Sequence, residues 1–247
     1  SILISNDAGT GTLSSASNNT GFGFEVFDDL TSGTQNTAFG RKALTVLTTG
    51  GSNTAFGMNS LVANTTGSTN TAVGMGSLAA NTTASNNTAV GSSALIANTT
   101  GSANTTGQYN TVVGTLALST DTKGSRAVAV GYGALNTQNF TSATNNYNVA
   151  IGHAAGNNVS TGQENTFIGG LAGQLNTTGA ENTAVGSSAL NANTTASSNV
   201  AVGRMALRDN TTGASNTALG HQAMIVNTTG HSVVAVGKDA LRGNTTG

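Results

Sequence analysis

One glycine recurs along the chain with a period of seventeen positions, as from Gly23 to Gly40. It closes a run of the type Asn-Thr-Ala-Val-Gly, and ten of the twelve intervals between successive copies have this length. The copies are Gly23, Gly40, Gly57, Gly74, Gly91, Gly114, Gly131, Gly152, Gly169, Gly186, Gly203, Gly220 and Gly237. A fixed period is the signature of a repeat architecture, in which each repeat packs against its neighbours. We therefore expect a single array over residues 1–247, with a degenerate first coil at 1–18 and insertions near 102–107 and 139–144.

Each repeat has the same pattern around its glycine. The preceding residue is always apolar, Thr or Val stands two positions before that residue, and Ala lies between them in ten of thirteen copies. Leu follows the glycine by four positions in nine copies, and Asn begins the run in eleven. Short β-branched runs between Gly and Asn turns indicate strands. A helical repeat is disfavoured because each internal Gly would cost about 1 kcal/mol, and a disordered chain would not keep Leu and Phe in register.

The pattern therefore predicts an all-β chain, a β-solenoid (parallel β-helix or β-roll) of about 13–14 coils that pair at about 4.8 Å, with one repeat in each coil. We expect the apolar position before the glycine and the Leu position to form the core, and the Ala position to face outward as a flat strip. Asn columns are expected to pass amide hydrogen bonds from coil to coil. The predicted core ladder is Phe39, Phe56, Val73, Leu78, Val90, Leu95, Ile151, Ile168, Val185 and Leu190.

Two adjacent coils depart from this pattern. Gly156 and Gly173 stand where the core Leu is expected, and the same coils are the ones with Ile before the repeat glycine, at Ile151 and Ile168. We expect the extra methylene groups of Ile to compensate part of the resulting void, since core voids cost several kcal/mol. Phe167 replaces Ala in one of these coils and is expected to point outward.

The composition excludes several classes of function. Only 7% of the residues are charged, against roughly 25% in ordinary globular domains. Eight Lys and Arg against nine Asp and Glu leave a net charge of -1, which argues against nucleic acid and anionic membranes because both need clustered cations. The chain has no apolar run long enough to span a membrane, so we expect no membrane insertion.

Reactive side chains are few. The chain has no Cys, which removes disulfides, thiolate metal sites and Cys nucleophiles. His153 and His221 share a column four coils apart, and His231 lies in a turn, so they cannot converge on one metal ion. Glu164 and Glu181 stack in adjacent coils at a separation that glycoside chemistry would permit, but solvated surface charge is the simpler interpretation. We expect no enzyme, no cofactor and no metal site.

Three features are candidates for modification or binding. Asn-Thr-Thr triplets match the glycosylation acceptor, although glycans on every coil would crowd one another and a hydrogen-bonded turn is the alternative. The triplets begin at Asn64, Asn81, Asn98, Asn104, Asn176, Asn193, Asn210, Asn227 and Asn244. The second feature is a candidate aromatic patch near the insertions, formed by Tyr109, Tyr132, Phe140 and Tyr147. The third is the regular Thr array of the type Thr65, Thr82 and Thr99.

The repeat resembles the head repeats of trimeric autotransporter adhesins. Val149-Ala150-Ile151-Gly152 and Val200-Ala201-Val202-Gly203 match the Val-Ala-Ile-Gly-like strand of those heads. The chain is also similar to repeat arrays of phage tail-fibre-like and secreted bacterial surface proteins. The resemblance implies a β-roll, exposure on a cell or virion surface, and adhesion as a trimer, although the heads use a shorter coil.

We therefore expect a non-enzymatic structural subunit of an extracellular fibre or surface filament, in which identical copies associate end to end or laterally. The alternatives are an adhesin head that binds glycans or a surface, and an ice-binding protein with a Thr array.

Overall fold

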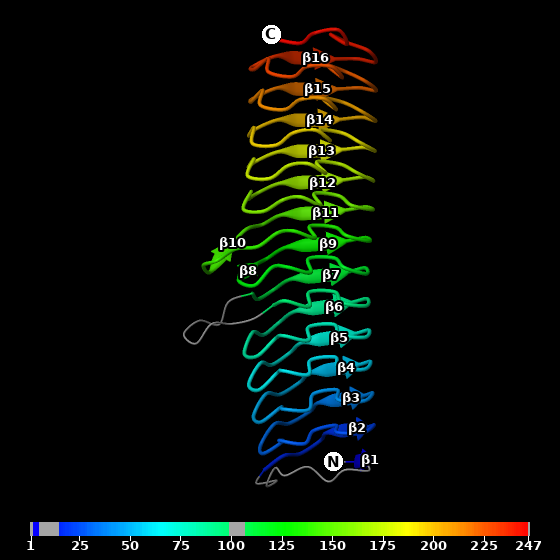
Figure 1. Cartoon of the computed structure of the whole chain (residues 1–247), viewed down its shortest axis with the longest axis vertical. Coiled ribbons are helices and arrows are strands. Elements are labelled where there is room, and N and C mark those ends of the chain that lie inside the picture. The colour runs from blue at the N-terminus through cyan, green and yellow to red at the C-terminus, as the bar shows by residue number, and fades with distance from the viewer. Residues whose placement is uncertain (1, 5–14, 99–106, 247) are drawn as a thin grey trace. The chain divides into compact units, whose positions relative to one another are not determined.

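The computed structural model of the chain describes residues 2–4, 15–98 and 107–246, which consist of strands, turns and bends without any helix. Parallel strands recur with the period of the sequence repeat (Figure 1), so the predicted all-β solenoid is confirmed. The chain divides into two units, which are described separately. The first is Ser1–Arg126 with Phe140–Asn145, and the second is Ala127–Asn139 with Asn146–Gly247. The single array over 1–247 stays a prediction.

The first unit is a stack of short parallel strands. Those described are β1 (Ile2–Ile4), β2 (Thr20–Phe22), β3 (Thr37–Phe39), β4 (Thr54–Phe56), β5 (Thr71–Val73), β6 (Thr88–Val90) and β7 (Thr111–Val113), with a separate parallel pair, β8 (Gly124–Ser125) and β10 (Thr144–Asn145). Thr37 pairs with Thr54, one period further on, and Thr88 pairs with Thr111 across the first insertion. The first insertion therefore leaves the strand register unchanged. Residues 102–106 of that insertion lie outside the described residues.

The second unit repeats the same arrangement. Its described strands are β9 (Val128–Val130), β11 (Val149–Ile151), β12 (Thr166–Ile168), β13 (Thr183–Val185), β14 (Val200–Val202), β15 (Thr217–Leu219) and β16 (Val234–Val236). Val128 pairs with Val149 across the second insertion, and Thr166 pairs with Thr183 one period further on. The second insertion therefore also leaves the strands in register.

The repeat glycine is required by the distance between coils. Gly57 has a φ of +136°, and a Cβ added to it would lie 2.7 Å from the carbonyl carbon of Gly74 in the next coil. Residues with a side chain rarely adopt this backbone conformation. Backbone hydrogen bonds on both sides hold the coils at this separation, among them Gly57 N–H to the Phe39 carbonyl at 2.8 Å. The periodic glycine thus follows directly from stacking.

The strand face that packs into the core is the opposite of the one that the sequence predicted. In each strand after β1 that belongs to the repeat, the middle residue is buried and the first and third residues are exposed or half-buried. The buried middle residue is Ala in most coils, and it packs with the buried Leu column, including the predicted core residues Leu78, Leu95 and Leu190. Alternate residues of a strand point to opposite faces, so burying Ala forces the larger neighbours outward.

The assignment of seven residues to the core ladder is therefore wrong. Phe39, Phe56, Ile151 and Ile168 are exposed, and Val73, Val90 and Val185 are half-buried on the same outer face. The predicted outward Ala strip is wrong for the same reason. The space between the strands and the Leu column fits Ala, and a ring in every coil would overfill it.

The void predicted at Gly156 and Gly173 is filled by Phe167. This ring is completely buried, and a Cβ added to Gly156 would lie 2.8 Å from its Cδ2 atom, while one added to Gly173 would overlap it. Ile151 and Ile168 point away from the core, so the predicted compensation by Ile is wrong, as is the predicted outward direction of Phe167. The physical reason is space: one ring in the Ala column lies against both glycines that stand in the Leu column.

Two buried Asn columns confirm the predicted amide ladders. In the column before the strand, the N–H and Nδ2 of Asn36 donate to Oδ1 of Asn19 at 2.9 and 3.0 Å. In the column of the Asn-Thr-Thr triplets, Nδ2 of Asn193 donates to Oδ1 of Asn176 at 2.7 Å and to the Ala196 carbonyl at 2.9 Å. Each amide therefore links two coils while it closes its own turn.

Candidate functional site

Among the described residues, seven of the asparagines that begin Asn-Thr-Thr triplets are buried in the fold. Asn64, Asn81, Asn98, Asn176, Asn193, Asn210 and Asn227 are buried with their amide nitrogens hydrogen-bonded, and Asn244 is half-buried and donates to Asn227 at 2.9 Å. A glycan on one of the seven buried nitrogens would have to pass through the wall of the coil, so the structure favours the alternative of a hydrogen-bonded turn at these sites. Asn104 lies outside the described residues.

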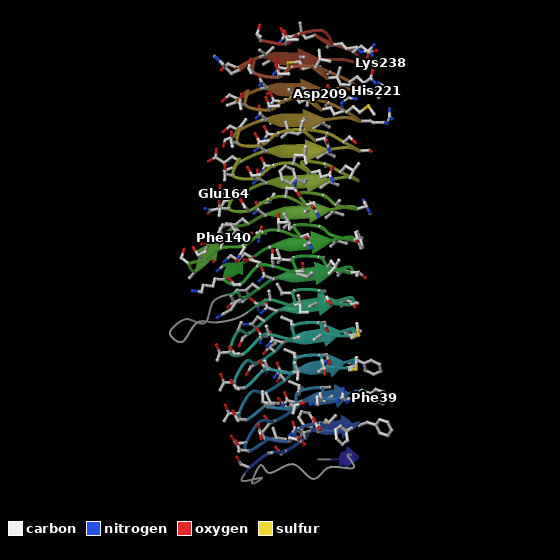
Figure 2. The ribbon with its side chains drawn as sticks, viewed as in Figure 1. Phe39, Phe140, Glu164, Asp209, His221 and Lys238 are labelled. Atoms are coloured by element: carbon white, nitrogen blue, oxygen red, sulfur yellow. The ribbon has the colours of Figure 1, made fainter. Side chains whose placement is uncertain are left out.

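The candidate aromatic patch is not assembled as predicted. Phe140 is buried: its N–H donates to Oδ1 of Asp121 at 3.2 Å and its carbonyl accepts from the Thr122 hydroxyl at 3.1 Å. The prediction that Phe140 belongs to an exposed patch is therefore wrong, because the second insertion folds this ring inward against the first unit. Figure 2 labels Phe140 beside the β8 and β10 pair.

The three tyrosines are exposed, but each has a different environment. The Arg126 guanidinium lies 5.3 Å from the ring centroid of Tyr109 in the first unit. In the second unit, Tyr132 stacks on His153 at 5.5 Å between ring centroids. Tyr132 follows the carboxyl end of β9, whereas Tyr147 precedes the amino end of β11. Since these positions lie at opposite ends of the strands, Tyr132 and Tyr147 do not form one platform.

The Thr side chains of the predicted array donate hydrogen bonds to backbone carbonyls of the next coil. The Thr65 hydroxyl donates to the Thr82 carbonyl at 3.1 Å, and the Thr48 hydroxyl donates to the Thr65 carbonyl at 3.0 Å. Thr99 lies outside the described residues. A second Thr column, at the first position of the strands, points outward, and its members Thr54 and Thr71 make no side-chain hydrogen bond to another described residue. The free hydroxyls are thus on the sheet face.

Ionisable groups are distributed over the surface. Across the described ranges, no three His, Cys, Asp or Glu side chains gather as metal ligands. Figure 2 shows Glu164 in an outer turn, and Oε2 of Glu181 accepts from the Ser198 hydroxyl at 3.2 Å. The side chain of Arg208 donates two hydrogen bonds of 2.7 Å to Asp209, and this contact raises the pKa of the guanidinium above its ordinary value.

The outer face of the strands is the most regular surface in each unit. It carries one column of Thr or Val and a second column of Phe, Val, Ile or Leu, since the first and third residues of each strand share a face. In the first unit, Phe22, Phe39 and Phe56 stack at centroid distances of 4.9 and 4.8 Å with interplanar angles of 14° and 7°. Figure 2 shows Phe39 projecting from the edge of the ribbon. This face can make extended, mostly apolar contacts.

Comparison of the chain with protein-family models, with curated proteins and with solved structures finds no match. The fold class therefore rests on the chain's own strands and register. Within residues 2–4, 15–98 and 107–246 there is no helix long and apolar enough to cross a membrane.

Proposed function

We propose that the chain is a non-enzymatic structural subunit of an extracellular fibre or surface filament, which associates with identical copies laterally or end to end. The observation that carries this proposal is the outer strand face, where an apolar side chain is exposed or half-buried in successive coils of each unit. Contiguous apolar surface of this kind marks interaction sites in soluble proteins. Reactive groups, in contrast, are scattered single residues or simple ion pairs.

The low charge of the chain agrees with a stacked assembly. Every side chain in a solenoid lies beside its counterparts in the neighbouring coils, so a charged column would place like charges about 5 Å apart. Few charges stack: Lys42 and Glu25 form an ion pair of 2.9 Å between adjacent coils, whereas Glu164 and Glu181 place like charges in adjacent coils. With only 7% of its residues charged, such a surface supports contacts over many coils with little electrostatic repulsion.

Negative-stain microscopy and sedimentation velocity over a wide concentration range test the proposal. We expect filaments or laterally paired particles, with a sedimentation coefficient that rises with concentration. Dispersed single particles at every concentration would overturn it.

A second candidate function is binding to a periodic ligand such as ice. The outward hydroxyls of Thr54, Thr71 and Thr88 repeat at the strand spacing of about 4.8 Å on a face of parallel strands. Thermal hysteresis of the purified chain tests this candidate, and replacement of these three residues by Leu should abolish any hysteresis. A glycan array tests the adhesin-head alternative, to which the exposed rings of Tyr109, Tyr132 and Tyr147 could contribute.

A further inference from the structure

The first unit carries an apolar surface that is broader than the repeat requires. We call it the aromatic face. Its members, with exposed fractions, are Phe22 (48%), Phe24 (37%), Phe39 (44%), Phe56 (50%), Met58 (40%) and Met75 (51%). Three of them occupy the last position of β2, β3 and β4, and the other three belong to the column two positions further on. The aromatic face therefore consists of two sequence columns, one on each side of the repeat glycine, and spans successive coils.

The second unit lacks such a face. Its outer column holds the shorter side chains Ile151, Ile168, Val202 and Leu219, at 37 to 39% exposure, and Val236 in the last strand, at 67%. The column two positions further on holds polar or charged residues in five coils, namely His153, Ser187, Arg204, His221 and Lys238. A wide apolar surface is thus confined to the first unit.

The stacking of the rings indicates what kind of ligand fits. Phe22, Phe39 and Phe56 lie nearly parallel and cover one another's faces. Recognition of a sugar by an aromatic ring uses the open face of the ring, and the middle ring, Phe39, has both faces covered. What the ladder presents to solvent is a ridge of ring edges, which have no hydrogen-bonding group. Such a ridge favours another apolar protein surface over a glycan.

We propose that the aromatic face binds the aromatic face of a second copy of this chain, forming a two-fold symmetric pair. This inference rests on the proposed self-association and specifies its contact. A Phe side chain has about 200 Å² to bury, so six large side chains exposed by a little under half offer on the order of 500 Å² per copy. Two copies would together bury about 1,000 Å², which reaches the size of a specific interface.

Charge selects the orientation of the pair. Arg41 is exposed in the same column as Phe24 and Met58. If the two-fold axis ran along the strands through Phe39, the middle ring of the stack, each Arg41 would face its own copy. If the axis runs along the stacking direction, Arg41 faces the outward Thr37 of the partner copy, and each Phe meets its own counterpart. Because like charges repel at short range, we infer the second arrangement, in which Phe22 lies opposite Phe22 and Phe56 opposite Phe56.

Sedimentation equilibrium of three full-length chains tests the contact. We expect the unchanged chain to associate, Phe39→Asp to raise the dissociation constant at least 100-fold, and Val202→Asp, the matched change on the outer face of the second unit, to alter it less than threefold. Circular dichroism checks that each chain is folded. Should Phe39→Asp fail to fold, Met58→Asp replaces it, because this residue lies outside the strands.

The outcomes separate the two proposals. If the unchanged chain associates and Phe39→Asp associates equally well, the aromatic-face contact is overturned while self-association stands. If both Asp variants lose association alike, the restriction to the first unit is overturned. If the unchanged chain stays monomeric at all concentrations, self-association and the contact both fail.

Cross-linking tests the orientation. The chain has no Cys, so Phe22→Cys introduces its only thiol. With a short bifunctional maleimide, Phe22→Cys alone should form covalent homodimers. In a mixture of Phe22→Cys and Phe56→Cys, the yield of the mixed dimer should not exceed the yield of either homodimer. A preference for the mixed dimer would overturn the inferred axis.

Discussion

The ring of Phe167 occupies the space left by Gly173 in the same coil of the second unit. A Cβ added to Gly173 would overlap the ring, which is completely buried. The reciprocal exchange occurs in the first unit, where Gly21 stands in the Ala column and Phe27 in the Leu column, and a Cβ on Gly21 would lie 3.0 Å from Cδ2 of Phe27. In both coils a larger side chain in one column accompanies a glycine in the facing column, so the change in core volume is small, and packed interiors tolerate such exchanges best.

This relationship predicts the effect of truncating the ring. Phe167→Ala restores the Ala of the repeat but leaves a void beside Gly156 and Gly173, and should cost about 3–5 kcal/mol of unfolding free energy. Adding Gly173→Leu should recover at least half of the loss, because Leu190 adopts the same backbone conformation one coil further on, with a φ of 51° against 55° for Gly173. Gly173→Leu alone should destabilise by overpacking.

Denaturant unfolding, together with hydrogen exchange in β11 to β13, measures these effects, because a solenoid can unfold in parts. Ile168→Ala is the control: this side chain is on the outer face and should cost less than about 1 kcal/mol. A larger loss for Ile168→Ala than for Phe167→Ala would restore the core assignment that the sequence suggested.

The sequence predicts the coil, the period and the Asn ladders, because these depend only on columns in register. It does not determine which strand face is inside, since alternation places Thr37 and Phe39 together without fixing their direction. Hydrophobicity alone favoured Phe39 for the core. The paired exchanges Gly21 with Phe27 and Phe167 with Gly173 were the available signal, because only facing positions need to share a volume.

The exposure of the aromatic face and the burial of the Asn-Thr-Thr asparagines both depend on the direction in which side chains point, which the sequence pattern does not fix. Once Ala is inside, the Phe stack is outside, and the feature first assigned to the core becomes a contact surface. The triplets suggested solvent-exposed turns, but Asn193 faces inward because a stacked amide can satisfy its hydrogen bonds against the neighbouring coils. A local acceptor motif contains no information about that direction.

The buried amide ladder predicts a pH-dependent loss of stability. Asn193→Asp keeps the shape of the side chain but replaces an amide that donates to Asn176 and to the Ala196 carbonyl by a group with acceptors only. The loss should be about 3 kcal/mol or more near neutral pH. Burial raises the pKa of the introduced carboxyl, so its protonated form is favoured in the folded chain, and the loss relative to the unchanged protein should shrink as the pH falls.

Urea unfolding at pH 4 and pH 8 measures this difference. Ser215→Asp provides the control, because Ser215 is exposed in a turn of the following coil, and its cost should stay below about 0.5 kcal/mol at both pH values. Equal losses for the two variants, or a loss at Asn193 that grows on acidification, would contradict the ladder.

A strained turn offers a stabilising change. Thr69 is exposed with a φ of 59°, a left-handed conformation that β-branched residues strongly disfavour. Asn86 holds the same column position one coil later with a φ of 62°, and Asn tolerates this region. Thr69→Asn should therefore stabilise the first unit by about 1 kcal/mol.

Thr71→Asn, two positions on in strand β5, is the control and should destabilise the first unit instead, because strands favour β-branched residues. Thermal unfolding midpoints distinguish the two, and a shift in the same direction for both would refute the role of the turn.

The repeat glycine gives the sharpest contrast between two substitutions to Ala. At Gly57 a Cβ would lie 2.7 Å from the Gly74 carbonyl carbon, and the φ of +136° excludes an unstrained side chain. Gly57→Ala should therefore lower the free energy of unfolding by about 3 kcal/mol or more.

At Gly170, directly after the repeat glycine of its own coil, a Cβ would meet nothing within 4 Å. Gly170→Ala should be neutral or stabilise by up to about 1 kcal/mol, because Ala restricts the unfolded chain. Parallel denaturant titrations of the two variants measure the difference, and similar stabilities would show that the spacing between coils does not require the periodic glycine.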